Sequence, residues 1–193
     1  IASGNYSTAL GVSTTASGNE STAMGWETAA TGVGSTAMGE QTTASGEAST
    51  AMGYQTTASG IGSTAMGKST ASGTYSTAMG YDTVASGVGS TAMGRSTASD
   101  YASTVIGQYN SSGSSATSAS SFSTSAPAFV IGNGTASNAR SDAFKVMFNG
   151  DATVSNDLTV SGDVVISSDA RLKSNIVSLG STLPKLLQID GKS

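Results

Sequence analysis

The sequence contains no cysteine and no histidine among its 193 residues, and only 10% of the residues are charged. Without cysteine there are no disulfides, so rigidity must come from backbone hydrogen bonds and from contacts between chains. Because the Cys and His ligands of common metal sites are missing, we expect no metal site, and nothing in the sequence indicates a cofactor.

Positive charge is also scarce. The chain has 8 Lys and Arg against 12 Asp and Glu, which gives a formal net charge of −4. The cationic residues do not cluster along the sequence, which disfavours nucleic-acid binding. No run of about 18 apolar residues occurs, so we expect no membrane insertion.

Glycine, serine and threonine are present instead, in a strict period. Ser-Thr-Ala-Met-Gly occurs six times, and each copy is followed by a Met-free version such as Thr-Thr-Ala-Ser-Gly. The methionines are 14 residues apart with one step of 13, so one unit recurs along one axis, as in a solenoid. Frequent Thr and Gly oppose a helix, so we predict an all-β fold whose coils each contain two short strands and two turns.

The two faces of these strands follow from the alternation of side chains. We number the positions of each half-repeat as slots 1 to 7, starting at the first Ser or Thr. Slots 1, 3 and 5, for example Ser21, Ala23 and Gly25, point to one face, and slots 2 and 4 point to the other. Slot 3 is nearly always Ala, which predicts the inside of a very thin coil.

Slot 4 then faces outward, with a large apolar residue on one sheet and Ser or Thr on the other. The apolar residues form a row that we call the apolar stripe: Leu10, Met24, Met38, Met52, Met66, Met79, Met93 and Ile106. Burying a methionine is worth roughly 1.5–3 kcal/mol, so an uncovered row of this length favours aggregation. The apolar stripe therefore predicts partner chains and forms the candidate core of an oligomer.

The opposite arrangement, with Met inside and Ala outside, is the alternative. It would place Ser and Thr in the core, where each hydroxyl needs an internal hydrogen-bond partner. It would also remove the need for oligomerisation.

Slot 6 on the Met side forms a second row, which we call the ridge: Trp26, Glu40, Tyr54, Lys68, Tyr81 and Arg95. Lys68, between Tyr54 and Tyr81, and Arg95, beside Tyr81, are placed for cation–π contacts of about 0.5–1 kcal/mol each. One interpretation is a glycan- or receptor-binding surface built on aromatic residues. The other is a row of packing contacts between coils or between chains.

The alternating Ala-x-Gly half-repeats of about seven residues resemble the YadA-like head of trimeric autotransporter adhesins, from Ile1 to about Gly107. The resemblance implies a left-handed parallel β-roll in residues 1–107, three copies of which pack around a three-fold axis. The same module also occurs in phage and viral fibres.

The period fails after Gly107. Residues 108–127 are Ser-rich and read as a connector. Residues 128–167 alternate again, and Asn149-Gly150 predicts a hairpin turn between two strands. Leu158, Val160, Val164 and Ile166 continue this alternation, and such sparse strands favour intertwining among three chains.

Residues 168–193 carry a second resemblance. Ser-Asp-Ala-Arg-Leu-Lys, at 168–173, is similar to the entry of the endosialidase-type intramolecular chaperone of phage tail spikes and fibres. The resemblance implies a self-cleavage dyad of Ser168 and Lys173, with Asp169 beside the scissile position. The same residues also fit the start of a short helix, with Ser168 or Asp169 as N-cap. We expect no cleavage here, because only 25 residues follow Ser168 and the family's chaperone is longer.

Three functions fit these observations. The first is a non-enzymatic homotrimeric fibre or spike segment of a virion, which serves as a rigid spacer and attaches to a host receptor or glycan. The second is a bacterial cell-surface trimeric adhesin. The third is an ice-binding solenoid. It is disfavoured because slots 1 and 2 point to opposite faces, so two consecutive threonines never lie on the same face of the sheet.

Overall fold

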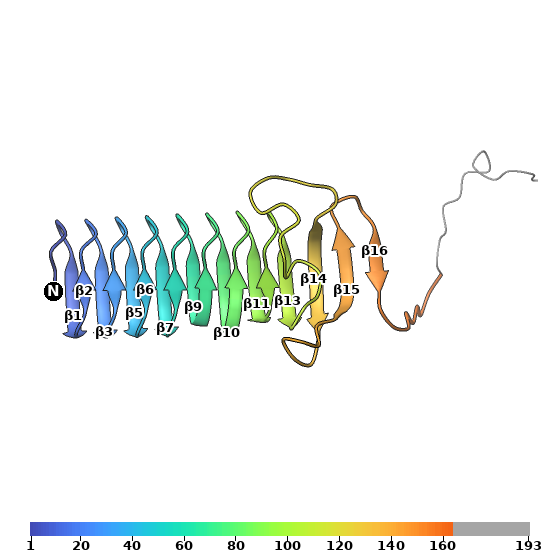
Figure 1. Ribbon diagram of the computed structural model, residues 1–193, viewed down its shortest axis with the longest axis horizontal. Coiled ribbons are helices and arrows are strands. Elements are labelled where there is room, and N and C mark those ends of the chain that lie inside the picture. Colours follow the sequence, from blue (N-terminus) through green and yellow to red (C-terminus); the bar gives the residue numbers. More distant parts are fainter. Residues whose placement is uncertain (164–193) are drawn as a thin grey trace, which may run out of the picture. The chain divides into compact units, whose positions relative to one another are not determined.

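The computed structural model describes residues 1–163 and contains only strands, turns and loops in this range (Figure 1). Residues Ile1–Asp157 form one compact unit. The strands are β1 (Thr8–Val12), β2 (Thr15–Ala16), β3 (Thr22–Trp26), β4 (Ala29–Ala30), β5 (Thr36–Glu40), β6 (Thr43–Ala44), β7 (Thr50–Tyr54), β8 (Thr57–Ala58), β9 (Thr64–Ala71), β10 (Thr77–Ala85), β11 (Thr91–Arg95), β12 (Thr97–Ala98), β13 (Thr104–Gln108), β14 (Pro127–Asn133), β15 (Asp142–Met147) and β16 (Ala152–Val154).

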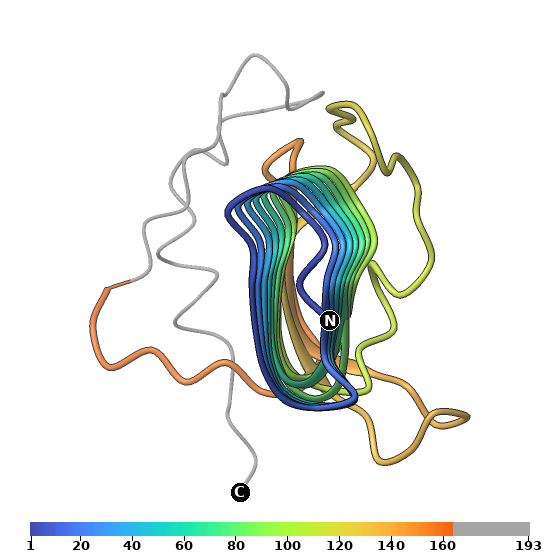
Figure 2. The same ribbon diagram turned by 90° about the vertical axis from the view of Figure 1, so that its left-hand side faces the viewer.

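The repeats form a parallel β-solenoid, as predicted. Each strand that carries a residue of the apolar stripe pairs in parallel with its counterpart in the next coil, in the order β1, β3, β5, β7, β9, β10, β11, β13. The Met-free halves form the other side of each coil, as the two-residue strands β2, β4, β6, β8 and β12 and the second halves of β9 and β10. Viewed along the axis, the coils superimpose as one narrow, flattened loop (Figure 2).

The inside of this loop is lined by alanine. Every slot-3 Ala from Ala16 to Ala98 has no exposed surface, and Val105 and Val130 extend this core. The slot-1 hydroxyls also point inward, and those of Ser21 and Ser49 donate to carbonyl oxygens three residues earlier, at 2.6 and 2.7 Å. The alternative with methionine inside is therefore wrong.

Slot 5 on the Met side requires glycine because adjacent coils approach closely. Gly25 has a φ of +125°, and a Cβ added to it would collide with the carbonyl oxygen of Gly39 in the next coil. An L side chain rarely adopts this backbone conformation. Glycine is thus required at this slot both by the backbone conformation and by the close approach of the next coil.

The Ser-rich connector lies against the last coils. The Ser99 amide donates to the Gly113 carbonyl at 2.9 Å, and the Val88 amide donates to the Ala119 carbonyl at 2.8 Å. Buried Asp100 replaces the usual slot-5 glycine, and its Oδ1 accepts the Thr117 and Ser118 amides. This explains why the repeat departs from glycine at this position.

The sheet continues beyond the connector. Strand β14 pairs in parallel with β13, and β15 and β16 follow as antiparallel neighbours joined by the predicted Asn149-Gly150 turn. These strands therefore have partners in their own chain, and intertwining between chains stays a prediction. Leu158 and Val160 lie in no strand and are exposed, contrary to the prediction, while Val164 and Ile166 lie outside the described residues.

Candidate functional site

The apolar stripe is a continuous row on the outer face of the Met-containing sheet. Leu10 pairs with Met24, Met24 with Met38, and the register continues unbroken through Met93 to Ile106. The methionines are half-buried by their neighbours in the row, while Leu10 at the end is 65% exposed. A single chain therefore leaves this row partly open to solvent.

The row is longer than the sequence predicted. Ile106 pairs with Ile131 of β14, Ile131 with Phe144 of β15, and Phe144 with Val154 of β16. Phe129, next to Ile131 on the same face, packs edge-to-face on Phe144 with ring centroids 6.3 Å apart. The sequence signal for this extension is Phe-Val-Ile-Gly at 129–132, which repeats the Thr-Val-Ile-Gly of β13.

The ridge follows the edge of the same sheet. Trp26, Glu40 and Tyr54 occupy successive coils in register, and Lys68 pairs with Tyr81. The aromatic residues are open to solvent, with exposed fractions of 43% for Trp26, 47% for Tyr54 and 55% for Tyr81. The ridge is therefore an accessible surface of the isolated chain.

Charged and aromatic ridge residues make two of the three contacts that the sequence suggested. The Lys68 ammonium lies 5.0 Å from the centroid of the Tyr81 ring, and the Arg95 guanidinium lies 5.1 Å from the same centroid. Asp82 bridges both cations, at 3.8 Å from Lys68 and 3.1 Å from Arg95. The predicted contact of Lys68 with Tyr54 is not among the cation–π contacts of residues 1–163.

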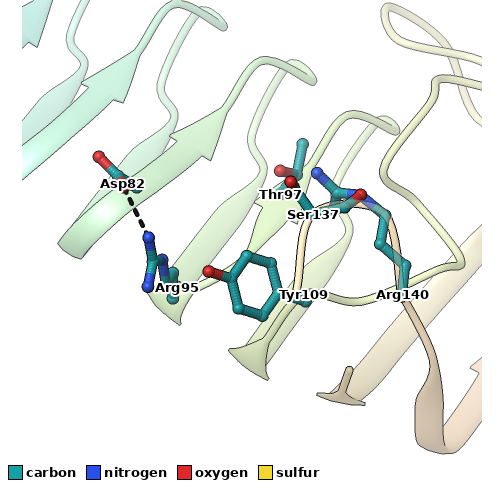
Figure 3. A pocket seen from close by; sticks show the side chains of 6 residues that line it. All are labelled: Asp82, Arg95, Thr97, Tyr109, Ser137 and Arg140. Atoms are coloured by element: carbon teal, nitrogen blue, oxygen red, sulfur yellow. Dashed lines mark hydrogen bonds and ion pairs between the residues drawn. The ribbon is translucent and has the colours of Figure 1, made fainter. Parts of the chain in front are cut away.

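A hollow of about 260 Å³ opens beside Arg95, at the end of the ridge (Figure 3). Asp82, Arg95, Thr97, Tyr109, Ser137 and Arg140 line it. The Arg95 guanidinium lies 4.8 Å from the centroid of the Tyr109 ring. Tyr109, Ser137 and Arg140 were not predicted as site residues, because they follow the last repeat and the sequence gives no signal that the fold brings them to Arg95.

The C-terminal resemblance lies outside the described residues. Ser168, Asp169 and Lys173, together with the expected helical segment, fall within 164–193. The self-cleavage dyad therefore stays a prediction.

The repeats match a known family. The family model of the YadA head domain repeat matches residues 2–28, 30–55, 44–70 and 71–97. The coils of the β-roll are thus similar to YadA head domain repeats. No curated protein sequence matches the chain. The YadA head repeats account for the coils that carry Met24 to Met93, while residues 98–193 lie beyond the match.

None of the elements in residues 1–163 is a helix with the length and hydropathy to cross a membrane. The same residues hold no group of three or more Cys, Asp and Glu side chains placed to bind a metal ion.

Proposed function

We propose that this chain is a segment of a homotrimeric attachment fibre, in which three YadA head β-rolls pack their apolar stripes around a common axis. The unbroken register from Leu10 to Ile106 carries this proposal. It continues through Ile131 and Phe144, so one apolar surface runs from the roll onto the C-terminal strands.

A trimer accounts for features that a monomer leaves unexplained. The outward Met row has the same residue in six successive coils, whereas the other sheet presents Ser or Thr at the equivalent slot. Apolar surface of this length costs free energy in water, and covering it removes that cost. With an interior of alanine, each thin roll has little core of its own, so stability depends on its neighbours.

The ridge supplies the attachment surface of this fibre. Its aromatic side chains are solvent-exposed, and such residues are enriched where proteins bind partners. Within this proposal the rolls act as a rigid spacer, and the ridge contacts a receptor or glycan on a host surface. The chain performs no enzymatic turnover in this role.

We further propose that the fibre belongs to a virion, as part of a phage tail fibre or spike. The Ser-Asp-x-Arg-Leu-Lys pattern at 168–173 supports this origin, because it resembles the chaperone entry of such fibres. A bacterial surface adhesin fits the YadA head repeats equally well. The sequence of the complete gene separates the two, since a membrane anchor encoded in it would contradict a virion origin.

Two measurements test the fibre proposal. Sedimentation equilibrium of the purified chain should give three times the chain mass of 18.8 kDa. Labelled trimer should then bind whole host cells saturably. A mass of one chain would refute the trimer, and a trimer that binds no cell surface would refute attachment.

A further inference from the structure

Two coils of the roll are one residue shorter than the others. Met66 and Met79 are 13 residues apart, as are Met93 and Ile106, whereas the other successive members of the apolar stripe are 14 apart. The missing residue is the one at slot 7, because Lys68 and Arg95 at slot 6 are followed directly by Ser69 and Ser96.

Slot 7 normally carries a residue in the left-handed conformation. Gln55 has a φ of +50°, Asp82 of +50° and Tyr109 of +44°. In the register between β9 and β10, Tyr81 pairs with Lys68 and Thr83 with Ser69, so Asp82 has no counterpart. Each short coil therefore leaves a gap between the slot-7 side chains of the coils before and after it.

Both gaps are hollows with a cation at the short coil. One, of about 240 Å³, has Gln55 and Asp82 on its two sides and Lys68 between them. The other, of about 260 Å³, has Asp82 and Tyr109 on its two sides and Arg95 between them. The Tyr109 amide donates to the Arg95 carbonyl at 2.9 Å, which fixes this side of the second hollow.

The loop between β14 and β15 adds a second guanidinium to the larger hollow. Arg140 Nη1 donates to the Asn110 carbonyl at 3.1 Å, and its Nε donates to the Ser137 carbonyl at 3.2 Å. Both partners are neutral, so the charge of Arg140 has no carboxylate beside it in these contacts. Figure 3 shows Arg140 and Ser137 on the loop, with Tyr109 between them and Arg95.

The two hollows hold most of the positive charge in the described part of the chain, residues 1–163. Residues 1–67 contain four glutamates and no Lys or Arg, and residues 1–163 contain only four cationic side chains. Three of those four line the two hollows: Lys68, Arg95 and Arg140. Asp82 balances one of them, so the site keeps a net positive charge on an otherwise acidic protein.

We propose that the hollow between Asp82 and Tyr109 binds the carboxylate or sulfate group of an acidic glycan. The two guanidiniums supply several N–H donors for the acceptor oxygens of such an anionic group. The hydroxyls of Thr97, Ser137 and Tyr109 suit the hydroxyls of a sugar, and tyrosine faces suit its ring. At about 260 Å³ the hollow is smaller than a pocket for a drug-sized ligand, so it takes one sugar unit of a longer chain.

This inference rests on the proposed attachment function, because it names the ligand class of the ridge. The smaller hollow at Lys68 shares Asp82 with the larger one and continues along the ridge. An extended acidic polysaccharide would therefore meet a further cation, Lys68, two coils along the roll from Arg95.

The test is calorimetric titration of the purified chain, in its native oligomeric state, with defined probes. A hexasaccharide of galacturonic acid supplies carboxylates, a heparin-derived hexasaccharide adds sulfates, and maltohexaose is the neutral comparison. We expect an acidic probe to bind in a salt-sensitive manner and maltohexaose not to bind. Preference for one acidic probe identifies the anionic group.

Variants locate the binding. Arg140→Gln, alone and with Arg95→Gln, should weaken binding by about tenfold or more, as expected when charge-assisted hydrogen bonds are lost. Lys145→Gln on β15 makes the same charge change away from both hollows and should leave affinity within about twofold.

Several results would overturn the proposal. These are a trimer that binds neither acidic probe, an equal loss of affinity in Lys145→Gln, or tighter binding of a single-stranded oligonucleotide than of either glycan. If Arg140→Gln instead dissociates the trimer, the hollow is a contact between chains. A wild-type chain that sediments as a monomer refutes the fibre proposal itself, so the two failures are distinguishable.

Discussion

Replacing Met52 and Met66 by aspartate should dissociate the oligomer without unfolding the roll. Both residues lie on the outer face, and neither belongs to the alanine-lined core. Each is already half-buried in the single chain, so completing its burial is worth roughly 1 kcal/mol, below the 1.5–3 kcal/mol of full burial. Two residues in each of three copies then contribute about 6 kcal/mol of the association free energy.

The substitution also places six carboxylates next to one another near the axis. Repulsion and loss of apolar contact act in the same direction, and 6 kcal/mol corresponds to about four orders of magnitude in the dissociation constant. Sedimentation velocity at micromolar concentration should therefore show a trimer for the original chain and a monomer for the double variant. Circular dichroism should keep its β-sheet signal in both.

The matched control is Ser45→Asp with Ser59→Asp. These residues occupy the same slot on the opposite sheet and are exposed. They add the same charges to two successive Met-free half-repeats, so the control should stay trimeric. A trimeric Met variant, or dissociation of the serine control, would show that we assigned the contact surface to the wrong face.

Three further changes test the construction of the roll and its end. Ala51→Leu places a larger side chain in the fully buried interior and should cost 1–3 kcal/mol or more, seen as a lower Tm, whereas the same change at exposed Ala139 should shift stability by less than about 0.5 kcal/mol. Gly39→Ala should destabilise more than Gly34→Ala, because a Cβ at Gly39 meets the next coil's backbone while one at Gly34 meets nothing within 4 Å; equal unfolding midpoints in urea would refute the close-approach argument. Asp100→Asn weakens the acceptor for two connector amides, so proteolysis within residues 111–121 should become faster while the roll stays intact; an unchanged cleavage rate would contradict the role of Asp100.

The sequence predicts the repeat region well because its signals are local and repeated. The alternation of Ala23 and Met24 within a strand determines which residue faces inward, and the Met-to-Met spacing determines which strands pair. Because every coil repeats the same pattern, the assignment of the inner and outer faces does not depend on any single residue. The inside, the outside and the apolar stripe could therefore be read from the period.

The larger hollow depends on contacts that the period does not encode. Tyr109 and Arg140 lie after the last Ser-Thr-Ala-Met-Gly copy, and the intervening Ser-rich connector hides the continuation of the sheet into β14. The step of 13 residues is visible in the sequence. The gap that it leaves beside a cation is not, because this gap depends on where the slot-7 residues of the two neighbouring coils lie. Lys68, Arg95 and Arg140 are also far apart in the sequence, so their shared location at the two hollows could not be predicted from it.

Site-specific cross-linking tests the shared Met surface most directly, since a chain without cysteine allows a single introduced thiol. Met52→Cys should react with a short bismaleimide to give covalent dimers, with one chain of each trimer left over. Ser59→Cys, on the exposed face of the other sheet, should remain monomeric under the same conditions. Monomer alone from Met52→Cys, or dimers from Ser59→Cys in equal yield, would contradict the claim that three apolar stripes meet at one axis.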